Sequence, residues 1–473
     1  MMDIKALVQE QKSFFQNGLT AKADFRKYSL VRLKKSIEDY EEDILEALKL
    51  DLGKSKTEAY MTELATVYGE IEYFRRNIKK LMKVKRNNFS PATFPSKGRI
   101  YSEGYGSVLI MSPWNYPFQL AIMPLIGAIA GGNCAVVKPS AYAAHTSKIV
   151  KKIIETTFDE EYVACVTGGR EENSMLLEEP FDYIFFTGGA EVGREVLRKA
   201  AENIIPVTLE LGGKSPVIVE KTADVDIAAR RIVWGKYLNC GQTCVAPDYV
   251  LIDKSLKEEF VKKSISYIEA MYGSDPIKSK NYGKIVNSKH LLRLEDNLKG
   301  QGILYGGSFD MEAGKLEPTI VDEPDLSSRL MSEEIFGPIM PIIAYENIEE
   351  AYKIISRRPK PLALYMFTGN KKAAEDVISK LQFGGGCIND TIMHLATDMP
   401  FGGVGNSGMG AYHGKKSYDT FTREKSILVK GSSLDVPFRY SVDKSAKPGS
   451  LGLKLMRALG DERRLKIIRF LLK

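Results

Sequence analysis

The stretch DYIFFTGGAEVGREVLRKA, residues 182–200, joins an apolar strand, a glycine turn and an amphipathic helix. An uninterrupted apolar run that gives way to helical periodicity is typical of a buried strand and its crossover helix. N–H groups at the start of such a helix suit a pyrophosphate, and Gly188 and Gly193 would permit close approach. Their spacing is G-x-x-x-x-G instead of G-x-G-x-x-G, and no phosphate-binding lysine follows Gly193. A turn that only tightens helix–strand packing therefore stays an equal alternative.

The same alternation continues in both directions along the chain. Further strands are expected at residues 106–111, 134–138, 162–168, 207–213 and 215–219, and helices at 119–130, 145–157 and 190–201. A second helix–strand series begins near Asp224 and passes Ile388, whereas the first 85 residues or so are helix-rich. Alternation of this kind builds βαβ units. The sequence therefore predicts an α/β protein with a parallel sheet covered by helices on both faces.

One apolar run is long enough to cross a bilayer. PFQLAIMPLIGAIAGGNCAVV, residues 117–137, contains no charged residue. The GGN triplet divides it into an apolar helix and a β-branched strand. A buried helix followed by a buried parallel strand explains the same residues better.

The composition is that of a soluble globular protein. Of 473 residues 44% are hydrophobic, and 67 basic against 60 acidic residues give a net charge of +7. So small an excess does not indicate nucleic-acid binding. The N-terminus MMDIKALVQEQKSFF lacks the apolar core of a signal peptide, so the five cysteines are expected to be reduced thiols in the cytoplasm.

Two of these cysteines lie four residues apart in LNCGQTCVAPD, residues 238–248. No matching Cys/His pair follows Cys240 and Cys244, which disfavours zinc, and the expected compartment disfavours a disulfide. The glycine, polar and proline residues around them indicate a loop, where functional residues concentrate. A cysteine nucleophile attacks as the thiolate. The pattern alone does not say which thiol would act.

Three polar residues follow predicted strand ends, where open α/β sheets bind their ligands. Glu210 could serve as a general base, Asn115 could donate to an oxyanion, and Lys138 could hold a ribose or phosphate. The alternatives are a strand-end ion pair, a proline-bounded turn and a solvated lysine. Viewed singly, the turn and the solvated lysine are the better explanations for Asn115 and Lys138.

Taken together, seven segments resemble the aldehyde dehydrogenase superfamily. They are SPWNYP, VVKPS, FTGGAEVG, LELGGKSP, NCGQTCVAPD, SEEIFGP and MPFGGVGNSGMGAYHGKKSYDTFT, in the family's order from about Gly104 to about Lys430. GAYHGK, the short N-terminal region and an extension after Lys430 are most similar to the class 3 and fatty-aldehyde branch. The resemblance implies a Rossmann-like cofactor domain, a second α/β catalytic domain and a small β bridging element for oligomerisation.

The resemblance also implies the roles of single residues. Cys244 becomes the nucleophile and Glu210 the base for hydrolysis, while Asn115 and the backbone N–H of Cys244 form the oxyanion hole. No metal is implied. Cofactor contacts are implied for Trp114, Lys138, Gly188, Gly193, Leu211, Glu334 and Phe336, and substrate contacts for Tyr116 and Phe401.

The implied activity is oxidation of medium- or long-chain aliphatic or aromatic aldehydes to acids with NAD or NADP. Ala141 stands where many NAD-preferring members have a glutamate for the adenosine 2′-hydroxyl, so NADP should be tolerated. One alternative is transfer of the acyl group to coenzyme A, against which Glu210 argues. Another is a non-catalytic binding protein on the same scaffold.

The resemblance further implies a domain order. Residues 1–85 and 105–212 are expected to bind the cofactor, 213–417 to form the catalytic domain, and 86–104 and 418–432 to form the bridging element of a homodimer. Residues 433–473 would be a C-terminal extension. Its end is too short and too charged to span a bilayer. It could lie weakly on an anionic membrane surface, or dock on the dimer.

Overall fold

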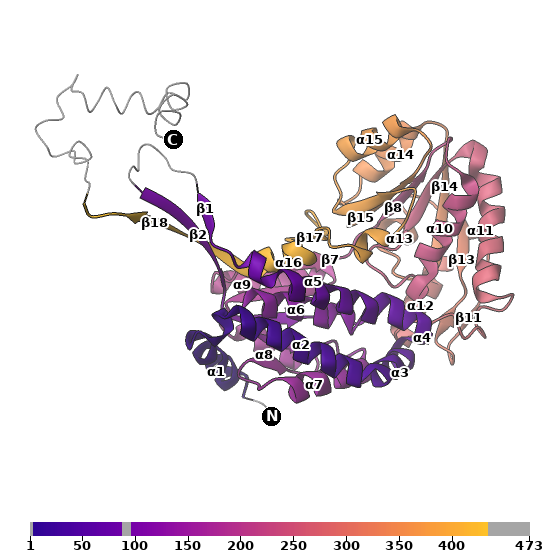
Figure 1. The fold of residues 1–473 in the computed structure, drawn as a ribbon. Helices are drawn as coiled ribbons and strands as arrows, with labels where there is room; N and C mark the ends of the chain where they lie inside the picture. The colour runs from indigo at the N-terminus through magenta and orange to yellow at the C-terminus, as the bar shows by residue number, and fades with distance from the viewer. Residues whose placement is uncertain (1–2, 88–95, 434–473) are drawn as a thin grey trace, which may run out of the picture. The chain divides into compact units, whose positions relative to one another are not determined.

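The computed structural model describes residues 3–87 and 96–433 (Figure 1). Two compact units are present, one within Met1–Ile78 and Gly104–Thr422, the other within Lys79–Glu103 and Arg423–Lys473. The predicted extension, from residue 434 onward, lies outside the described residues.

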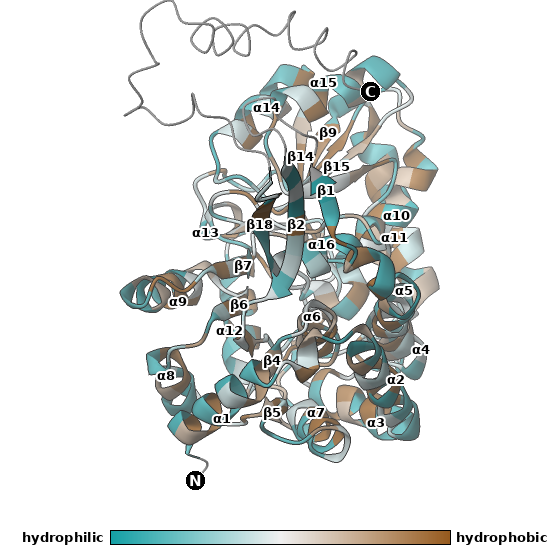
Figure 2. Cartoon of the chain, turned by 60° about the vertical axis from the view of Figure 1, so that its left-hand side comes forward, coloured by the Kyte–Doolittle hydropathy of each residue, from teal (hydrophilic) through white to brown (hydrophobic). Residues whose placement is uncertain are grey.

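The first unit begins with helices, as the sequence predicts. These are α1 (Ile4–Gln16), η1 (Leu19–Ala21), α2 (Ala23–Asp39), α3 (Glu41–Leu52), α4 (Lys56–Ala59), a π-helical turn η2 (Tyr60–Leu64) and α5 (Ala65–Leu81). Their inward positions are apolar, such as Leu30, Leu33 and Ile37 on α2, all fully buried. Hydrophobic and hydrophilic residues alternate along these helices (Figure 2), the pattern of helices with one buried face.

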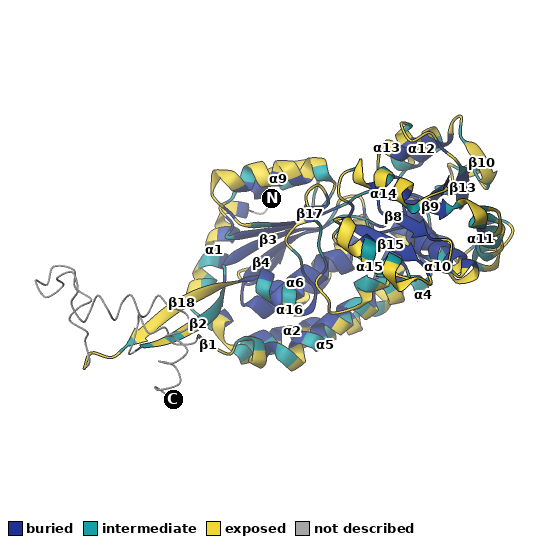
Figure 3. Ribbon diagram, turned by 90° about the horizontal axis from the view of Figure 1, so that it is seen from above, coloured by how far each residue is buried: buried dark blue, intermediate teal, exposed yellow. Residues whose placement is uncertain are grey.

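A six-stranded sheet of order β17-β7-β6-β3-β4-β5 forms the first core. Its strands are β3 (Ser107–Met111), β4 (Cys134–Lys138), β5 (Val163–Cys165), β6 (Tyr183–Gly188), β7 (Val207–Leu211) and β17 (Gly408–Met409). All are parallel except β17, which pairs antiparallel with β7. The helices between them are α6 (Gln119–Gly131), α7 (Ala144–Thr157), α8 (Arg170–Glu178) and α9 (Ala190–Glu202). Figure 3 shows buried strands with α9 on one side and α6 on the other, so the predicted α/β class is confirmed.

The apolar run at residues 117–137 becomes α6 and then β4. Every residue of both elements is buried, which confirms the prediction of a buried helix and strand. Within residues 3–87 and 96–433, no helix combines the length and apolarity that a membrane crossing requires.

The second sheet has the order β10-β13-β14-β9-β8-β15-β16. Its strands are β8 (Pro216–Val219), β9 (Tyr249–Asp253), β10 (Gly302–Tyr305), β13 (Thr319–Asp322), β14 (Ile339–Tyr345), β15 (Ala363–Phe367) and β16 (Gly385–Ile388). Only β10 is antiparallel to its neighbour. Ile218, Leu251 and Ile343 on one face pack against Ala351 and Val377.

The remaining helices of the first unit connect the strands of this sheet or, for the last two, follow β16 in the chain. They are α10 (Val225–Tyr237), η4 (Leu238–Gly241), η5 (Lys254–Leu256), α11 (Lys257–Tyr272), α12 (Ser288–Leu298), α13 (Arg329–Ser332), α14 (Ile348–Ser356), α15 (Lys371–Lys380), η6 (Met393–Ala396) and α16 (Gly414–Thr420). A small hairpin joins β11 (Phe309–Asp310) to β12 (Lys315–Leu316).

The second unit is a three-stranded sheet of order β1-β2-β18. Its strands are β1 (Lys85–Asn87), β2 (Ser96–Gly104) and β18 (Thr422–Lys430). Ile427, Leu428 and Val429 on β18 are 41%, 55% and 41% exposed, so apolar side chains remain uncovered here. The predicted domain boundaries, including that between residues 212 and 213, stay predictions.

Candidate active site

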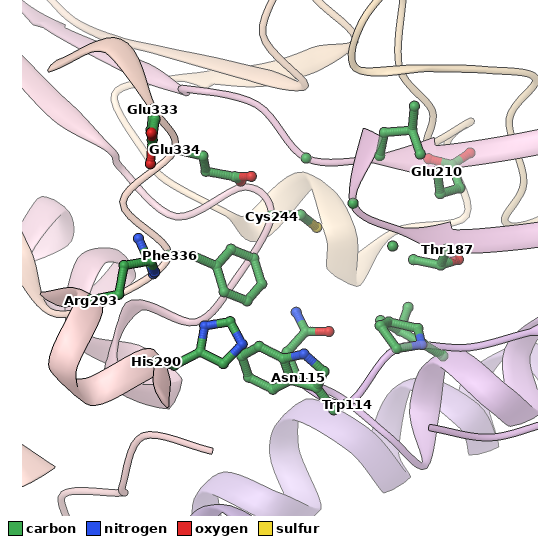
Figure 4. A pocket seen from close by; sticks show the side chains of 16 residues that line it. Trp114, Asn115, Thr187, Glu210, Cys244, His290, Arg293, Glu333, Glu334 and Phe336 are labelled. Carbon is green, nitrogen blue, oxygen red and sulfur yellow. The ribbon is translucent and has the colours of Figure 1, made fainter. Parts of the chain in front are cut away.

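Two cavities meet at Cys244. One is polar, has a volume of about 380 Å³, and lies at the carboxyl ends of β3, β6 and β7, where open α/β sheets bind ligands. The other is apolar and smaller, about 140 Å³. Cys244 is the only cysteine that lines either cavity among the described residues. Figure 4 shows it in the polar cavity with Asn115 and Glu210.

The segment that carries the two cysteines begins with a left-handed turn that includes Cys240. Asn239, Cys240 and Gly241 have φ values of 52°, 52° and 70°, a conformation that costs non-glycine residues energy. Gly241 allows it, because a Cβ there would lie 2.3 Å from the carbonyl oxygen of Gly337. The turn leaves Cys240 packed with Tyr282 and leaves Cys244 at the cavities.

Burial governs the charge of the reacting groups. It raises the pKa of the Cys244 thiol to about 12, and the nearby carboxyls of Glu334 and Glu210 add to the shift. Burial also raises the pKa of Glu210 well above its usual range, and within the described part of the chain neither of its carboxylate oxygens has a hydrogen-bond partner. Burial therefore favours the neutral form of both groups, and ionising one requires a water or another group to take its proton.

Asn115 lies on the loop after β3 and is 3% exposed. Its Nδ2 donates to the carbonyl oxygen of Gln242 at 3.0 Å. An amide nitrogen carries two hydrogens, so one N–H stays free for a second acceptor. The residue thus combines a fixed orientation with a spare donor in the polar cavity.

The polar cavity is also lined by a cluster of aromatic rings and by the carboxyl group of Glu334. Trp114 contacts Phe336 edge to face, with ring centroids 5.4 Å apart, and its centroid lies 5.3 Å from that of His290. Burial, with Asp248 nearby, raises the pKa of Glu334 to about 8, and its Oε1 is buried without a partner. An acid in this state suits hydrogen bonds with a bound ligand.

The comparisons with known proteins decide the family. The model described as "Aldehyde dehydrogenase family" matches residues 1–427. The chain belongs to the aldehyde dehydrogenase family. It is 48% identical over 429 residues to 4,4′-diaponeurosporen-aldehyde dehydrogenase of Staphylococcus aureus, covering 90% of this chain and 94% of that one.

Two mammalian relatives and two solved structures agree. Identity is 43% to aldehyde dehydrogenase family 3 member A2 of Rattus norvegicus (90% of this chain, 88% of that one) and 42% to the dimeric NADP-preferring aldehyde dehydrogenase of Canis lupus familiaris (91% and 95%). The substrate-bound Staphylococcus aureus AldH matches with a TM-score of 0.94 and 45% identity, covering 98% of this chain and all of that one. A Mycobacterium tuberculosis aldehyde dehydrogenase complexed with NAD⁺ gives 0.82 and 26%, covering 92% and 91%. The predicted class 3 branch of the aldehyde dehydrogenases is confirmed.

The aldehyde dehydrogenase has features that fit a dinucleotide beside Cys244. Helix α9 begins after Gly189 without a side-chain cap, so its first N–H groups are available to an anion. Gly188 and Leu211 line the cavity, and Glu334 offers its unpaired oxygen. Gly193 does not line this cavity. It packs closely against Leu211 instead, since a Cβ at Gly193 would lie 2.7 Å from Leu211 Cδ2. The position of Gly188 at the cavity fits the pyrophosphate turn. The position of Gly193 fits the alternative, a glycine that tightens helix–strand packing.

Lys138 is placed differently from the other predicted cofactor residues. Its Nζ donates to the carbonyl oxygens of Pro139 at 3.0 Å and Gly168 at 2.8 Å, and burial lowers its pKa. It is not among the residues that line the polar cavity. Its contact with a cofactor ribose stays a prediction.

The polar cavity of this aldehyde dehydrogenase is also lined by residues that the sequence did not indicate. His290 and Arg293 on α12 line the polar cavity, as do Glu333 and Thr187. Thr187 lies inside the predicted strand, directly before Gly188, so its position near the strand end was a usable signal. His290 and Arg293 reach the site only by tertiary contact, which no local pattern reports.

The apolar cavity contains both predicted substrate residues. Tyr116 and Phe401 line it, and the hydroxyl of Tyr116 lies 2.7 Å from Thr243 Oγ1. The other lining side chains are mostly apolar: Met61, Leu120, Trp234, Leu238, Ile392, Met393, Leu395 and Ala396. These residues come from four separate regions of the chain, which explains why sequence reasoning found only two residues of this cavity.

Proposed function

We propose that this enzyme oxidises apolar aldehydes to carboxylic acids with NAD or NADP, with Cys244 as the nucleophile. One observation carries the proposal: two side chains, Cys244 and Leu120, line both a polar cavity fit for a dinucleotide and an apolar cavity fit for a hydrocarbon chain, and of these two only Cys244 can act as a nucleophile. Asn115 and Glu210 line the same polar cavity. A non-catalytic scaffold would have no need to keep these groups together.

The first half of the reaction forms a bond to sulfur. Cys244 loses its proton, with Glu210 or water as the acceptor, and its sulfur attacks the aldehyde carbon to give a thiohemiacetal. The spare N–H of Asn115 and the backbone N–H of Cys244 hold the oxyanion. Each such donor stabilises the transition state by about 3–4 kcal/mol in related acyl-transfer sites. A bound nicotinamide supplies the acceptor for the hydrogen and two electrons that the aldehyde carbon then loses.

The second half releases the acid. Glu210, in its ionised form, takes a proton from water, whose oxygen attacks the thioester carbon. The C–S bond breaks and Cys244 leaves as the thiolate. The raised pKa of Glu210 makes it a stronger base than an exposed glutamate once it is ionised. Water as the acyl acceptor, instead of coenzyme A, follows from this base.

NADP should be accepted beside NAD. Ala141 is exposed and carries no charge to repel a 2′-phosphate, and a relative 42% identical is named NADP-preferring. If the catalytic efficiency with NADP were about a thousandfold lower than with NAD, a difference of about 4 kcal/mol, this part of the proposal would be wrong.

We also propose a cytoplasmic homodimer. The exposed apolar residues 427–429 of β18 lie on an edge strand, and such an edge readily pairs with another chain. A dimeric relative supports this reading. Sedimentation of the intact protein and of Leu428→Asp would test it, with a monomeric wild type contradicting the dimer.

The direct test of the activity is a panel of aldehydes from acetaldehyde to dodecanal. NADH or NADPH formation and acid release are measured with and without coenzyme A. We expect acid from the longer aldehydes in its absence. Acid release that requires coenzyme A would favour the acyl-transferring alternative, and cofactor binding without turnover of any aldehyde would favour the binding protein.

A further inference from the structure

Three charged side chains from the helical N-terminal region lie beside the loops that carry Asn115 and Cys244. Lys54 and Glu63 are fully buried, with side-chain exposures of 0%, and their Nζ–Oε1 distance is 2.5 Å. Glu58 lies nearby and is partly buried. A buried ion pair is often no more stabilising than an apolar pair of the same size. What these charges contact is therefore more informative than their pairing.

Lys54 contacts the loop that carries Asn115. Its Nζ donates to the backbone carbonyl of Asn115 at 3.3 Å and lies 4.0 Å from the ring centroid of Tyr116. Gly53, with φ of 67°, ends α3 and turns the chain so that Lys54 enters the core. One cation thus touches an oxyanion-hole residue and its neighbour in the substrate cavity.

Glu63 fixes the other end of the same loop. Its Oε2 accepts hydrogen bonds from the backbone N–H groups of Phe118 at 2.9 Å and Gln119 at 3.1 Å. Helix α6 begins here without a side-chain cap of its own. Glu63 supplies the cap from a different helix, and its negative charge suits a helix N-terminus.

Glu58 connects this arrangement to the nucleophile loop. Its Oε1 accepts from the backbone N–H of Asn239 at 2.9 Å, at the start of the left-handed turn. Asn239 Nδ2 in turn donates to the carbonyl oxygen of Asn115 at 2.7 Å. That single oxygen therefore receives both Lys54 and Asn239, and it joins the loops of Asn115 and Cys244.

We propose that Lys54, Glu63 and Glu58 are positioning residues that hold the Asn115 amide in register with the Cys244 loop. The inference rests on the proposed function, because it assigns Asn115 to the oxyanion. A shift of about 1 Å at a reacting centre can cost about 100-fold in rate. The cluster therefore acts on kcat more than on binding of the aldehyde or the cofactor.

The test is a double-mutant cycle between Lys54→Met and Asn115→Ala. In the wild-type background we expect Lys54→Met to lower kcat by about 100-fold, with the two KM values within about threefold. In the Asn115→Ala background the same change should cost less than about threefold, because the donor it positions is already gone. Equal losses in both backgrounds, or an unchanged kcat, would overturn the positioning role.

Two further variants keep the result interpretable. Glu63→Gln serves as the test if Lys54→Met fails to fold. It retains an oxygen for the N–H groups of α6 but removes the charge beside Lys54, and we expect it to lower kcat by about tenfold. Full activity of folded Glu63→Gln would then count against the cluster. Asp51→Asn is the matched control: Asp51 lies on α3, three residues before Lys54, is buried, and accepts from the backbone N–H of Thr146 at the start of α7, away from the site. It should lower the melting temperature and leave kcat within about twofold.

The two proposals fail in different ways. If Asn115→Ala alone retained full kcat, the oxyanion role would be wrong, and the inference with it. If Asn115→Ala lost about 100-fold or more while the cycle showed no coupling, only the positioning role would be lost.

Discussion

The polar and apolar cavities differ in what they can recognise. The polar cavity presents carboxyl groups of Glu210 and Glu334, a guanidinium and free helix N–H groups. The apolar cavity offers mainly methionine, leucine and aromatic surface, with the Tyr116 and Thr243 hydroxyls bonded to each other. The polar cavity can thus orient a ligand through hydrogen bonds, whereas the apolar cavity can bind one mainly by burying its apolar surface. In the proposed reaction, Cys244 attacks the aldehyde where directional contacts on one side meet non-directional contacts on the other.

The largest effect should come from Cys244, the cysteine that lines both cavities. Cys244→Ala removes the only thiol that lines either cavity among the described residues, and we expect aldehyde-dependent NADH formation to fall by about 10⁴-fold or more. Cofactor binding, followed by fluorescence quenching or calorimetry, should be retained. An active Cys244→Ala would end the view that the cavities meet at a nucleophile.

The next largest effect should come from the base in the polar cavity. Glu210→Gln should lower the steady-state rate by about 10²–10³-fold while acyl-enzyme accumulates, which mass spectrometry of quenched enzyme would show. Burial raises the pKa of Glu210, so the wild-type rate should rise with pH as the carboxyl ionises, and Glu210→Gln should lose that rise. The sign for stability is opposite. The folded state holds this proton more tightly, so the contribution of Glu210 is full below the unfolded pKa and is lost as pH rises through the folded one.

A pH-independent deacylation rate in the wild type would contradict this assignment. Measurement of single-turnover acid release from pH 6 to pH 9 would separate it from effects of pH on binding, and the stability sign can be read from melting temperatures in the same buffers.

These two predictions concern residues that the sequence already indicated, and the reason is physical. Glu210, Asn115 and Gly188 follow strand ends, and parallel strands bring their carboxyl ends to one edge of the sheet. Periodicity therefore predicted the fold, and strand ends placed candidate residues at one edge of it; the family resemblance assigned their roles, which stay predictions. His290, Arg293 and Met393 arrive from distant segments, so no local pattern could have placed them. The polar cavity was largely predictable from sequence, and the apolar one was not.

The apolar cavity should give smaller, graded effects. Each added CH₂ that it buries should raise kcat/KM by about fourfold, since burial is worth about 0.8 kcal/mol per CH₂. Met393 lies at its edge and is 43% exposed. Met393→Trp should therefore raise KM for dodecanal by about tenfold and change that for acetaldehyde or NAD little. Ile378→Trp, an exposed residue that lines neither cavity, is the matched control. A uniform change for all aldehydes would mean that this cavity does not select by length.

The smallest effect should come from Cys240, which lies four residues from Cys244 and lines neither cavity. It is 2% exposed, packs with Tyr282, and burial raises its pKa well above the usual range. A thiol that rarely ionises is slow to form a disulfide, even with an oxidised cysteine four residues away. Cys240→Ala should keep kcat within about twofold and lose up to about 2 kcal/mol of stability from the small cavity it leaves.

Peroxide distinguishes the two roles of Cys240. If Cys240 only packs, wild type and Cys240→Ala should lose activity to peroxide at the same rate and recover equally with dithiothreitol. Recovery confined to the wild type would show that the turn at residues 239–241 opens far enough for the two sulfurs to meet. The left-handed residues 239–241 would then change conformation when Cys244 is oxidised. Cys240 would be a packed thiol, distinct from the reacting one, only in the reduced enzyme.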